Sequence, residues 1–143
     1  MGKLLFAYGP LAWISKALAT IALIFTLAPT ARAEQVALVA FGDSLTQGYG
    51  LLEHEGFVPQ MRGWLKAQGV DVRLVNAGVS GDTTAGGAAR IDWTLPEDIQ
   101  GIAVALGGND LLRGLPPEEA RRNLETILKT ASAKNVPVLL IAG

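Results

Sequence analysis

Three residues of this sequence, Ser44, Gly78 and Asn109, are of the types that acyl-transfer chemistry uses. A serine acts as a nucleophile when a base takes its proton and N–H groups hold the oxyanion that forms. A glycine N–H can approach a substrate closely because no side chain is in the way. An asparagine amide offers a further donor. Together the three residues suggest hydrolysis through a covalent serine intermediate.

The elements that must position these residues alternate between strand-like and helix-like segments. Short apolar runs predict strands at Val36–Phe41, Val70–Val75, Ile102–Leu106 and Val136–Ala142. Helical spacing of apolar residues predicts helices at Gly56–Gln68, Thr83–Trp93 and Pro116–Lys134. This alternation predicts an α/β fold with a parallel sheet covered by helices on both faces.

Small polar segments follow the first three predicted strands, at 42–44, 76–78 and 107–110. In parallel sheets, ligands bind beyond the carboxyl ends of the strands. We therefore expect Ser44, Gly78 and Asn109 to meet at one rim, and this convergence is a stronger indication than any one motif.

Each motif taken alone also has a purely structural explanation. Serine and aspartate favour turns and caps, so Asp43 is expected to brace its turn and Asp110 to serve as a turn or cap residue. Gly78 could serve a tight turn, and Asn109 could be a helix cap.

Taken together, the segments resemble the SGNH, or GDSL-type, hydrolase family, and within it the bacterial periplasmic arylesterase, thioesterase and lysophospholipase group. The resemblance rests on "FGDSLTQGYG" (41–50), "EGFVPQM" (55–61), "NAGVSGDTT" (76–84) and "LGGNDLLRG" (106–114). It implies a three-layer α/β/α fold with a flavodoxin-like parallel sheet. It also implies that Ser44 is the nucleophile. The Ser44 N–H, the Gly78 N–H and the Asn109 side chain would then form the oxyanion hole.

The family's final motif, an Asp-x-x-His that supplies the base and its orienting carboxylate, is not found in these 143 residues. The single histidine, His54, lies in "LLEHEGF" and does not match that position, so we interpret it as a solvated loop residue. No helix follows the last predicted strand. We therefore expect a C-terminally truncated hydrolase domain that is inactive as it stands.

The N-terminal segment has the layout of a secretory signal peptide. Lys3 and Lys16 precede an apolar run at 17–27, and Ala-Arg-Ala follows at 31–33. A membrane anchor is the alternative, but spanning needs about 20 apolar residues and this run is shorter.

This interpretation divides the chain into a signal peptide, 1–33, and a hydrolase domain, 34–143. It predicts a periplasmic or secreted bacterial protein with no stable membrane insertion after cleavage.

Composition excludes several classes of function. The chain has no cysteine, so disulfides, thiol nucleophiles and cysteine metal sites are excluded. It has 12 basic and 13 acidic residues with no basic block, which argues against nucleic-acid binding. The glycine-rich stretch at 78–87 lacks the patterns of a nucleotide phosphate loop. We expect no cofactor, no metal and no protein partner, and a small acyl ester or thioester as substrate.

Two alternatives to an esterase of broad acyl specificity stay open on sequence grounds. A carbohydrate O-acetyl esterase would use the same machinery. A non-catalytic exported binding module would use the same rim as an anion pocket.

The signal-peptide interpretation predicts cleavage between Ala33 and Glu34. N-terminal sequencing of protein recovered from the periplasm or the medium should begin at Glu34. A membrane-bound product that still begins at Met1 would support the anchor.

Overall fold

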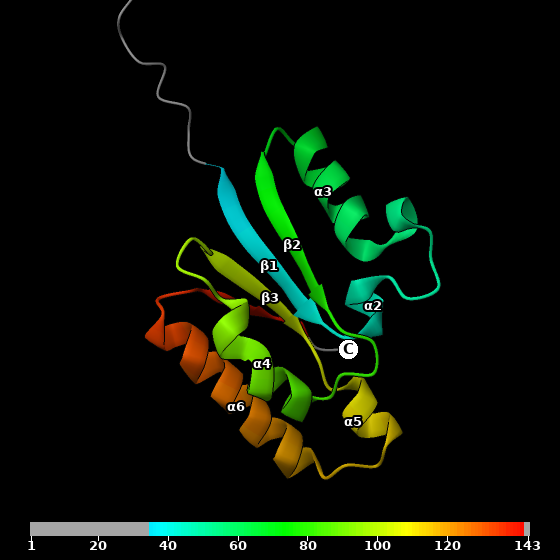
Figure 1. Cartoon of the computed structure of the whole chain (residues 1–143), viewed down its shortest axis with the longest axis vertical. Helices are drawn as coiled ribbons and strands as arrows, with labels where there is room; N and C mark the ends of the chain where they lie inside the picture. Colours follow the sequence, from blue (N-terminus) through cyan, green and yellow to red (C-terminus); the bar gives the residue numbers. More distant parts are fainter. Residues whose placement is uncertain (1–34, 142–143) are drawn as a thin grey trace, which may run out of the picture. The chain divides into compact units, whose positions relative to one another are not determined.

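The computed structural model describes residues 35–141 (Figure 1). The expected signal peptide, its cleavage site and the alternative anchor lie outside these residues. Within 35–141, no helix combines the length and the apolar character needed to cross a membrane.

Four parallel strands form the sheet, as the sequence predicts. They are β1 (Val36–Gly42), β2 (Val72–Gly78), β3 (Gly101–Ala105) and β4 (Val138–Leu140). Their order is β2-β1-β3-β4, which is the flavodoxin-like arrangement. Strand β1 pairs with β2 on one side and β3 on the other, so it lies inside the sheet.

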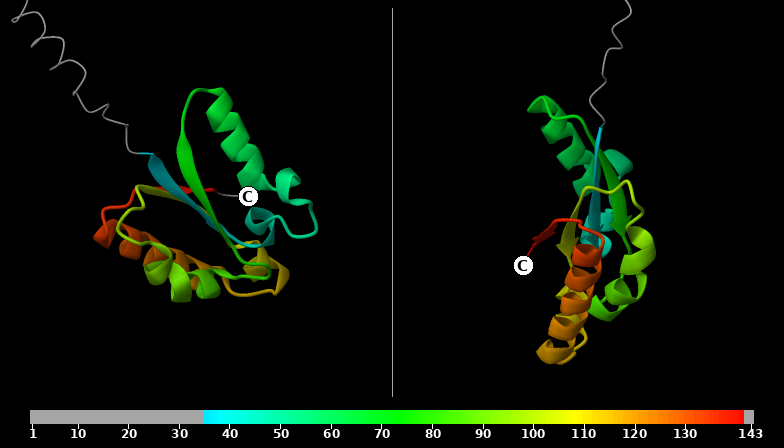
Figure 2. Two further views of the ribbon diagram at one scale, coloured as in Figure 1. Left: turned by 45° about the horizontal axis from the view of Figure 1, so that its top comes forward. Right: turned by 90° about the vertical axis from the view of Figure 1, so that its left-hand side faces the viewer.

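Helices cover both faces of this sheet. Successive side chains of β1 point to opposite sides, so each face carries apolar residues that a helix buries. Val39 and Phe41 pack into a core with helices α4 (Thr84–Thr94) and α6 (Pro117–Ala133). Ala40 packs on the other face, where α3 (Phe57–Ala67) contributes Val58. Figures 1 and 2 show α3 on one side of the sheet and α4 and α6 on the other.

Strand β2 differs from its predicted bounds, since it begins at Val72 and continues through Gly78. The segment Asn76–Gly78, expected to follow the strand, therefore belongs to it. Pairing with β1 continues to Gly42 opposite Gly78, which extends the strand by three residues. Asn76 is exposed, and its side chain is satisfied locally, since Nδ2 donates to the Gln47 carbonyl and Oδ1 accepts from the Gly78 N–H.

Three short helices escape prediction because none is long enough to show a helical period. They are α2 (Ser44–Gln47), the 3₁₀ turn η1 (Glu53–Glu55) and α5 (Gly108–Leu112). Helices α2 and α5 begin directly beyond the carboxyl ends of β1 and β3 (Figure 1). They carry Ser44 and Asn109, respectively.

Helix α4 forms despite two interior glycines, which normally weaken a helix. Gly87 lies where a Cβ would come within 2.4 Å of Leu106 Cδ1 and 3.2 Å of Phe41 Cε1. At Gly86, a Cβ would lie 1.9 Å from Asp82 Oδ1. Both glycines therefore allow close approach, one of the helix to the core and one of a carboxylate to the helix.

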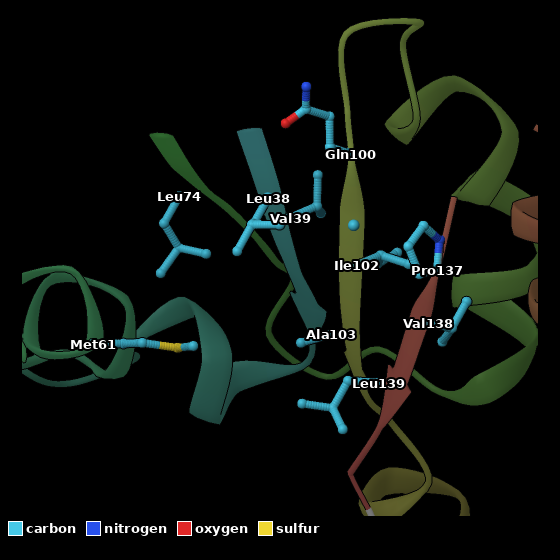
Figure 3. Close-up of a pocket in the computed structure, with 11 residues that line it drawn as sticks. Leu38, Val39, Met61, Leu74, Gln100, Ile102, Ala103, Pro137, Val138 and Leu139 are labelled. Carbon is cyan, nitrogen blue, oxygen red and sulfur yellow. The ribbon is translucent and has the colours of Figure 1, made fainter. Parts of the chain in front are cut away.

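An apolar hollow of about 340 Å³ lies over the middle of the sheet on the α3 side (Figure 3). Leu38, Met61 and Leu74 line it beside Ala103 and Leu139. Leu139 belongs to β4, which pairs only with β3 within the described sheet, and this residue is 63% exposed. Neither Ser44, Gly78 nor Asn109 lines the hollow, so it is separate from the predicted rim.

Gly63 in α3 and Gly87 in α4 should respond oppositely to replacement by alanine. A Cβ at Gly63 in α3 would meet nothing within 4 Å, so Gly63→Ala should raise the free energy of unfolding by about 0.5–1 kcal/mol. Gly87→Ala should lower it by about 1–3 kcal/mol, because the added methyl group overpacks the core. Urea denaturation measures both, and a stabilising Gly87→Ala would contradict the packing described for α4.

Candidate active site

Ser44 is the first residue of α2, directly beyond β1, and it is half-buried. The preceding Asp43 caps this helix, since its Oδ1 accepts a hydrogen bond from the Leu45 N–H at 3.0 Å. The expectation that Asp43 braces the turn is confirmed. At Gly42 a Cβ would lie 2.1 Å from Thr46 Oγ1 and 2.8 Å from the Ala105 carbonyl oxygen. Only glycine at 42 lets α2 fold back so closely against the strands.

The reactive groups of Ser44 are not committed to the fold. Among residues 35–141, no hydrogen bond is assigned to its Oγ or to its backbone N–H. Its carbonyl oxygen accepts from the N–H groups of Gly48 and Tyr49, both at 3.0 Å. The serine is therefore anchored through its carbonyl, while its hydroxyl and N–H can face a ligand.

Asn109 lies in the first turn of α5, and its side-chain amide points toward the serine turn. Nδ2 donates to the Asp82 carbonyl oxygen at 2.8 Å, and Asp43 Oδ2 lies 3.4 Å from the same nitrogen. The first bond is short and the second is at the weak limit of hydrogen bonding. The Nδ2–H that donates to the Asp82 carbonyl fixes the amide. The second Nδ2–H makes only the weak contact with Asp43, so it can donate to a developing oxyanion instead. These contacts join the segments that follow β1, β2 and β3.

Gly78 lies at the end of β2 opposite Gly42, at the expected rim. Its N–H donates to Asn76 Oδ1 at 3.0 Å, so it would have to share or exchange this bond to serve an oxyanion. A Cβ at Gly78 would come within 2.2 Å of the Gln47 nitrogen. The close packing of α2 on β2 is therefore reason enough for glycine at this position, and its role as a donor stays a prediction.

Gly81 is a second candidate donor, which the sequence analysis missed. It has a φ of +79° in the turn that Asp82 closes by donating its N–H to the Val79 carbonyl. Within the described part of the chain, no hydrogen bond is assigned to the Gly81 N–H, whereas its carbonyl accepts from Arg113 Nη2 at 2.7 Å. The sequence holds no signal that separates Gly81 from the other glycines, since its positive φ is a property of the backbone that five other described glycines share.

Asp110 lies next to Asn109 in the sequence but has a structural task. Asp110 is 3% exposed, and its carboxylate accepts from both the N–H and the hydroxyl of Thr84, at 2.8 and 2.5 Å. Asn123 on α6 donates to the same hydroxyl at 3.1 Å. Asp110 is therefore a helical residue of α5 that accepts from the first N–H of α4, whose N-cap is Thr83, and the expectation of a turn or cap residue was wrong in this respect.

His54 lies in η1 and is exposed. No hydrogen bond within residues 35–141 joins it to Ser44. This placement agrees with the interpretation of His54 as a solvated loop residue. Across the same residues, no cluster of three or more histidine or acidic side chains has the arrangement of a metal site.

The fold and this rim define a class of protein, a parallel α/β domain with a serine at the turn after its first strand. The sequence profile of the GDSL-like lipase/acylhydrolase family matches residues 40–143, and the chain belongs to this family.

Curated relatives of the chain carry the names of esterases. The chain is 40% identical to the esterase TesA of Pseudomonas aeruginosa over 78% of this chain and 56% of the relative. It is 31% identical to an arylesterase of Vibrio mimicus over 87% of this chain and 62% of the relative.

A solved structure with the same fold is the SGNH-hydrolase family esterase AlinE4. It superposes with a TM-score of 0.72 at 46% identity, over 75% of this chain and 58% of AlinE4. This chain therefore spans less than two thirds of the length of each of these relatives.

The roles of the neighbours Asn109 and Asp110 can be separated by stability. Asp110→Ala should lower the free energy of unfolding by about 1–3 kcal/mol, because it leaves the buried Thr84 N–H without its acceptor. The matched control is Asp98→Ala, which removes an exposed carboxylate paired with Arg73 and should cost less than about 1 kcal/mol. Equal costs in urea denaturation would contradict the assigned role of Asp110.

Proposed function

We propose that Ser44 is the nucleophile of an ester hydrolase that acts on carboxylic esters or thioesters of small molecules. The observation that supports the proposal is the hydrogen bonding of the Asn109 amide to Asp43, the residue before Ser44, and to Asp82, in a chain of the GDSL-like family. We take the Ser44 hydroxyl, the Ser44 backbone N–H and the Asn109 amide N–H as the groups of one site. These are the groups that acyl transfer requires.

In the proposed reaction, Ser44 Oγ attacks the carbonyl carbon of the substrate while a base takes the hydroxyl proton. The negative charge that develops on the carbonyl oxygen is held by the Ser44 N–H, the Asn109 amide and a glycine N–H. Gly78 is the glycine that the family resemblance implies, and Gly81 is the alternative, whose N–H has no assigned hydrogen bond among residues 35–141. The alcohol or thiol leaves with the proton, and water then releases the acid from the serine ester.

The base of this reaction would have to come from outside the 143 residues. His54 is the single histidine of the sequence, and it is exposed on η1 with no hydrogen bond to Ser44 among the described residues. The resemblance implies an Asp-x-x-His pair for this purpose. We therefore propose that this chain alone has little activity and that the protein in its natural length is the competent enzyme.

The same proposal includes export. Residues 1–33 would be removed as a signal peptide, and residues 34–143 would belong to the hydrolase domain in the periplasm or the medium.

Substitution of the two side chains tests the function in the natural-length protein. Ser44→Ala should abolish hydrolysis of a short-chain p-nitrophenyl ester. Asn109→Ala should lower kcat by about 10²–10³-fold, with a much smaller change in KM, because its bond is formed mainly with the oxyanion. Steady-state kinetics give both constants.

A suitable control is Asn135→Ala, at a residue with a positive φ just beyond α6 and away from the rim. It should leave kcat and KM unchanged. If Asn109→Ala kept kcat within about threefold of the parent, its role in the oxyanion hole would be wrong. Faster turnover of acetylated sugars than of p-nitrophenyl esters would instead favour the carbohydrate O-acetyl esterase.

A further inference from the structure

Arg90 on α4 is a buried cation whose partners all lie near the proposed site. It is 8% exposed. Its Nε donates to Asp82 Oδ2 at 2.7 Å, and its Nη2 donates to the Gly42 carbonyl oxygen at 3.1 Å. The guanidinium carbon lies 3.9 Å from the centre of the Phe41 ring, which adds a cation–π contact. Three constraints thus fix one side chain.

These partners connect Arg90 to both groups of the proposed chemistry. Gly42 ends β1 and precedes the Asp43–Ser44 turn, so its carbonyl fixes where the serine turn begins. Asp82 uses its side chain for Arg90 and its main-chain oxygen for Asn109 Nδ2. Arg90 therefore holds both the start of the serine turn, through the Gly42 carbonyl, and Asp82, which orients the Asn109 amide.

The fold makes room for this pair at a cost. Gly86 is required because a Cβ there would overlap Asp82 Oδ1, and glycine weakens α4. The Arg90 and Asp82 side chains are 10% and 12% exposed, so both charges are largely removed from water. A buried ion pair is weak grounds for stability, because desolvation offsets much of the attraction. Stability alone therefore does not account for this arrangement.

We propose that Arg90 and Asp82 form a positioning pair that sets the Asn109 amide and the Ser44 turn in register for oxyanion binding. The proposal rests on the proposed function for its kinetic consequences. Neither residue has to touch the substrate. Their effect is transmitted through the Asp82 carbonyl and the Gly42 carbonyl.

The kinetic test uses the natural-length protein and two variants that keep most of the local structure. Arg90→Lys keeps the positive charge but cannot reach both acceptors with a planar fork. Asp82→Asn keeps the main-chain oxygen that accepts from Asn109. Each should lower kcat by about 10–100-fold with KM within about threefold, since a displacement of about 1 Å can cost 10² in rate.

The matched control is Arg73→Lys. Arg73 also pairs with an aspartate, Asp98, but both are exposed and lie near the amino ends of the strands. This variant should leave kcat and KM unchanged. If Arg90→Lys does not fold, Asp82→Asn provides the same comparison.

A double-mutant cycle separates positioning from general support of the fold. In an Asn109→Ala background, Arg90→Lys should lower kcat by less than about threefold, because the amide through which it acts is gone. The same 10–100-fold loss in both backgrounds would overturn the proposal.

A readout independent of activity keeps the pair testable if the protein proves not to be an esterase. That failure would show as wild-type protein without Ser44-dependent turnover. The side-chain amide signals of Asn109 in ¹⁵N NMR should still shift, and exchange faster with water, in Arg90→Lys but not in Arg73→Lys. Unchanged Asn109 signals in Arg90→Lys would overturn the positioning role whatever the enzyme's activity.

Discussion

The parallel pairing of β1 with both β2 and β3 is the constraint on which the site depends. Because the three strands run in the same direction, their carboxyl ends lie at one edge of the sheet. The segments that follow them are then forced together, although they are far apart in the sequence. Glycine at 42 makes this meeting closer, since a Cβ there would overlap Thr46 and the Ala105 carbonyl.

Hydrogen bonds of side chains and of one main-chain carbonyl also fix the distances at that edge. Asp43 caps the serine helix, Asp82 accepts from Asn109 through its carbonyl, and Asp110 holds Thr84 at the start of α4. No buried side-chain nitrogen or oxygen within the described residues is left without a hydrogen-bond partner. A fully satisfied network of this kind is rigid, which is what a preorganised oxyanion site needs.

Much of this arrangement could be predicted from the sequence, because long elements leave a clear pattern. The apolar stripe of α6 and the buried run of β1 gave nearly correct bounds, and parallel topology followed from their alternation. The predicted end of β2 was wrong. Asn76 and Gly78 were expected in a turn after the strand, but the pairing with β1 continues through them. The helices that carry Ser44 and Asn109 have too few residues to show a period.

The tertiary contacts of the site leave weaker patterns in the sequence than the long helices and strands do. Arg90 reads as an ordinary helix residue, and only the fold shows that it contacts Asp82, Gly42 and Phe41. Gly86 and Gly87 would ordinarily weaken a helix. Gly87 is required by Phe41 and Leu106, which are distant in the sequence, and Gly86 by the side chain of Asp82, four residues earlier. Gly81 could be separated from Gly78 only after the backbone conformation and the hydrogen bond to Asn76 were known.

Covalent labelling distinguishes a nucleophilic Ser44 from a serine that only serves a turn. The natural-length protein would be treated with a fluorophosphonate probe, digested and analysed by mass spectrometry. We expect one adduct, on the peptide that contains Ser44, and slower labelling after Asn109→Ala. A protein that hydrolyses esters while Ser44 stays unlabelled, or that carries the probe on another residue instead, would contradict this role.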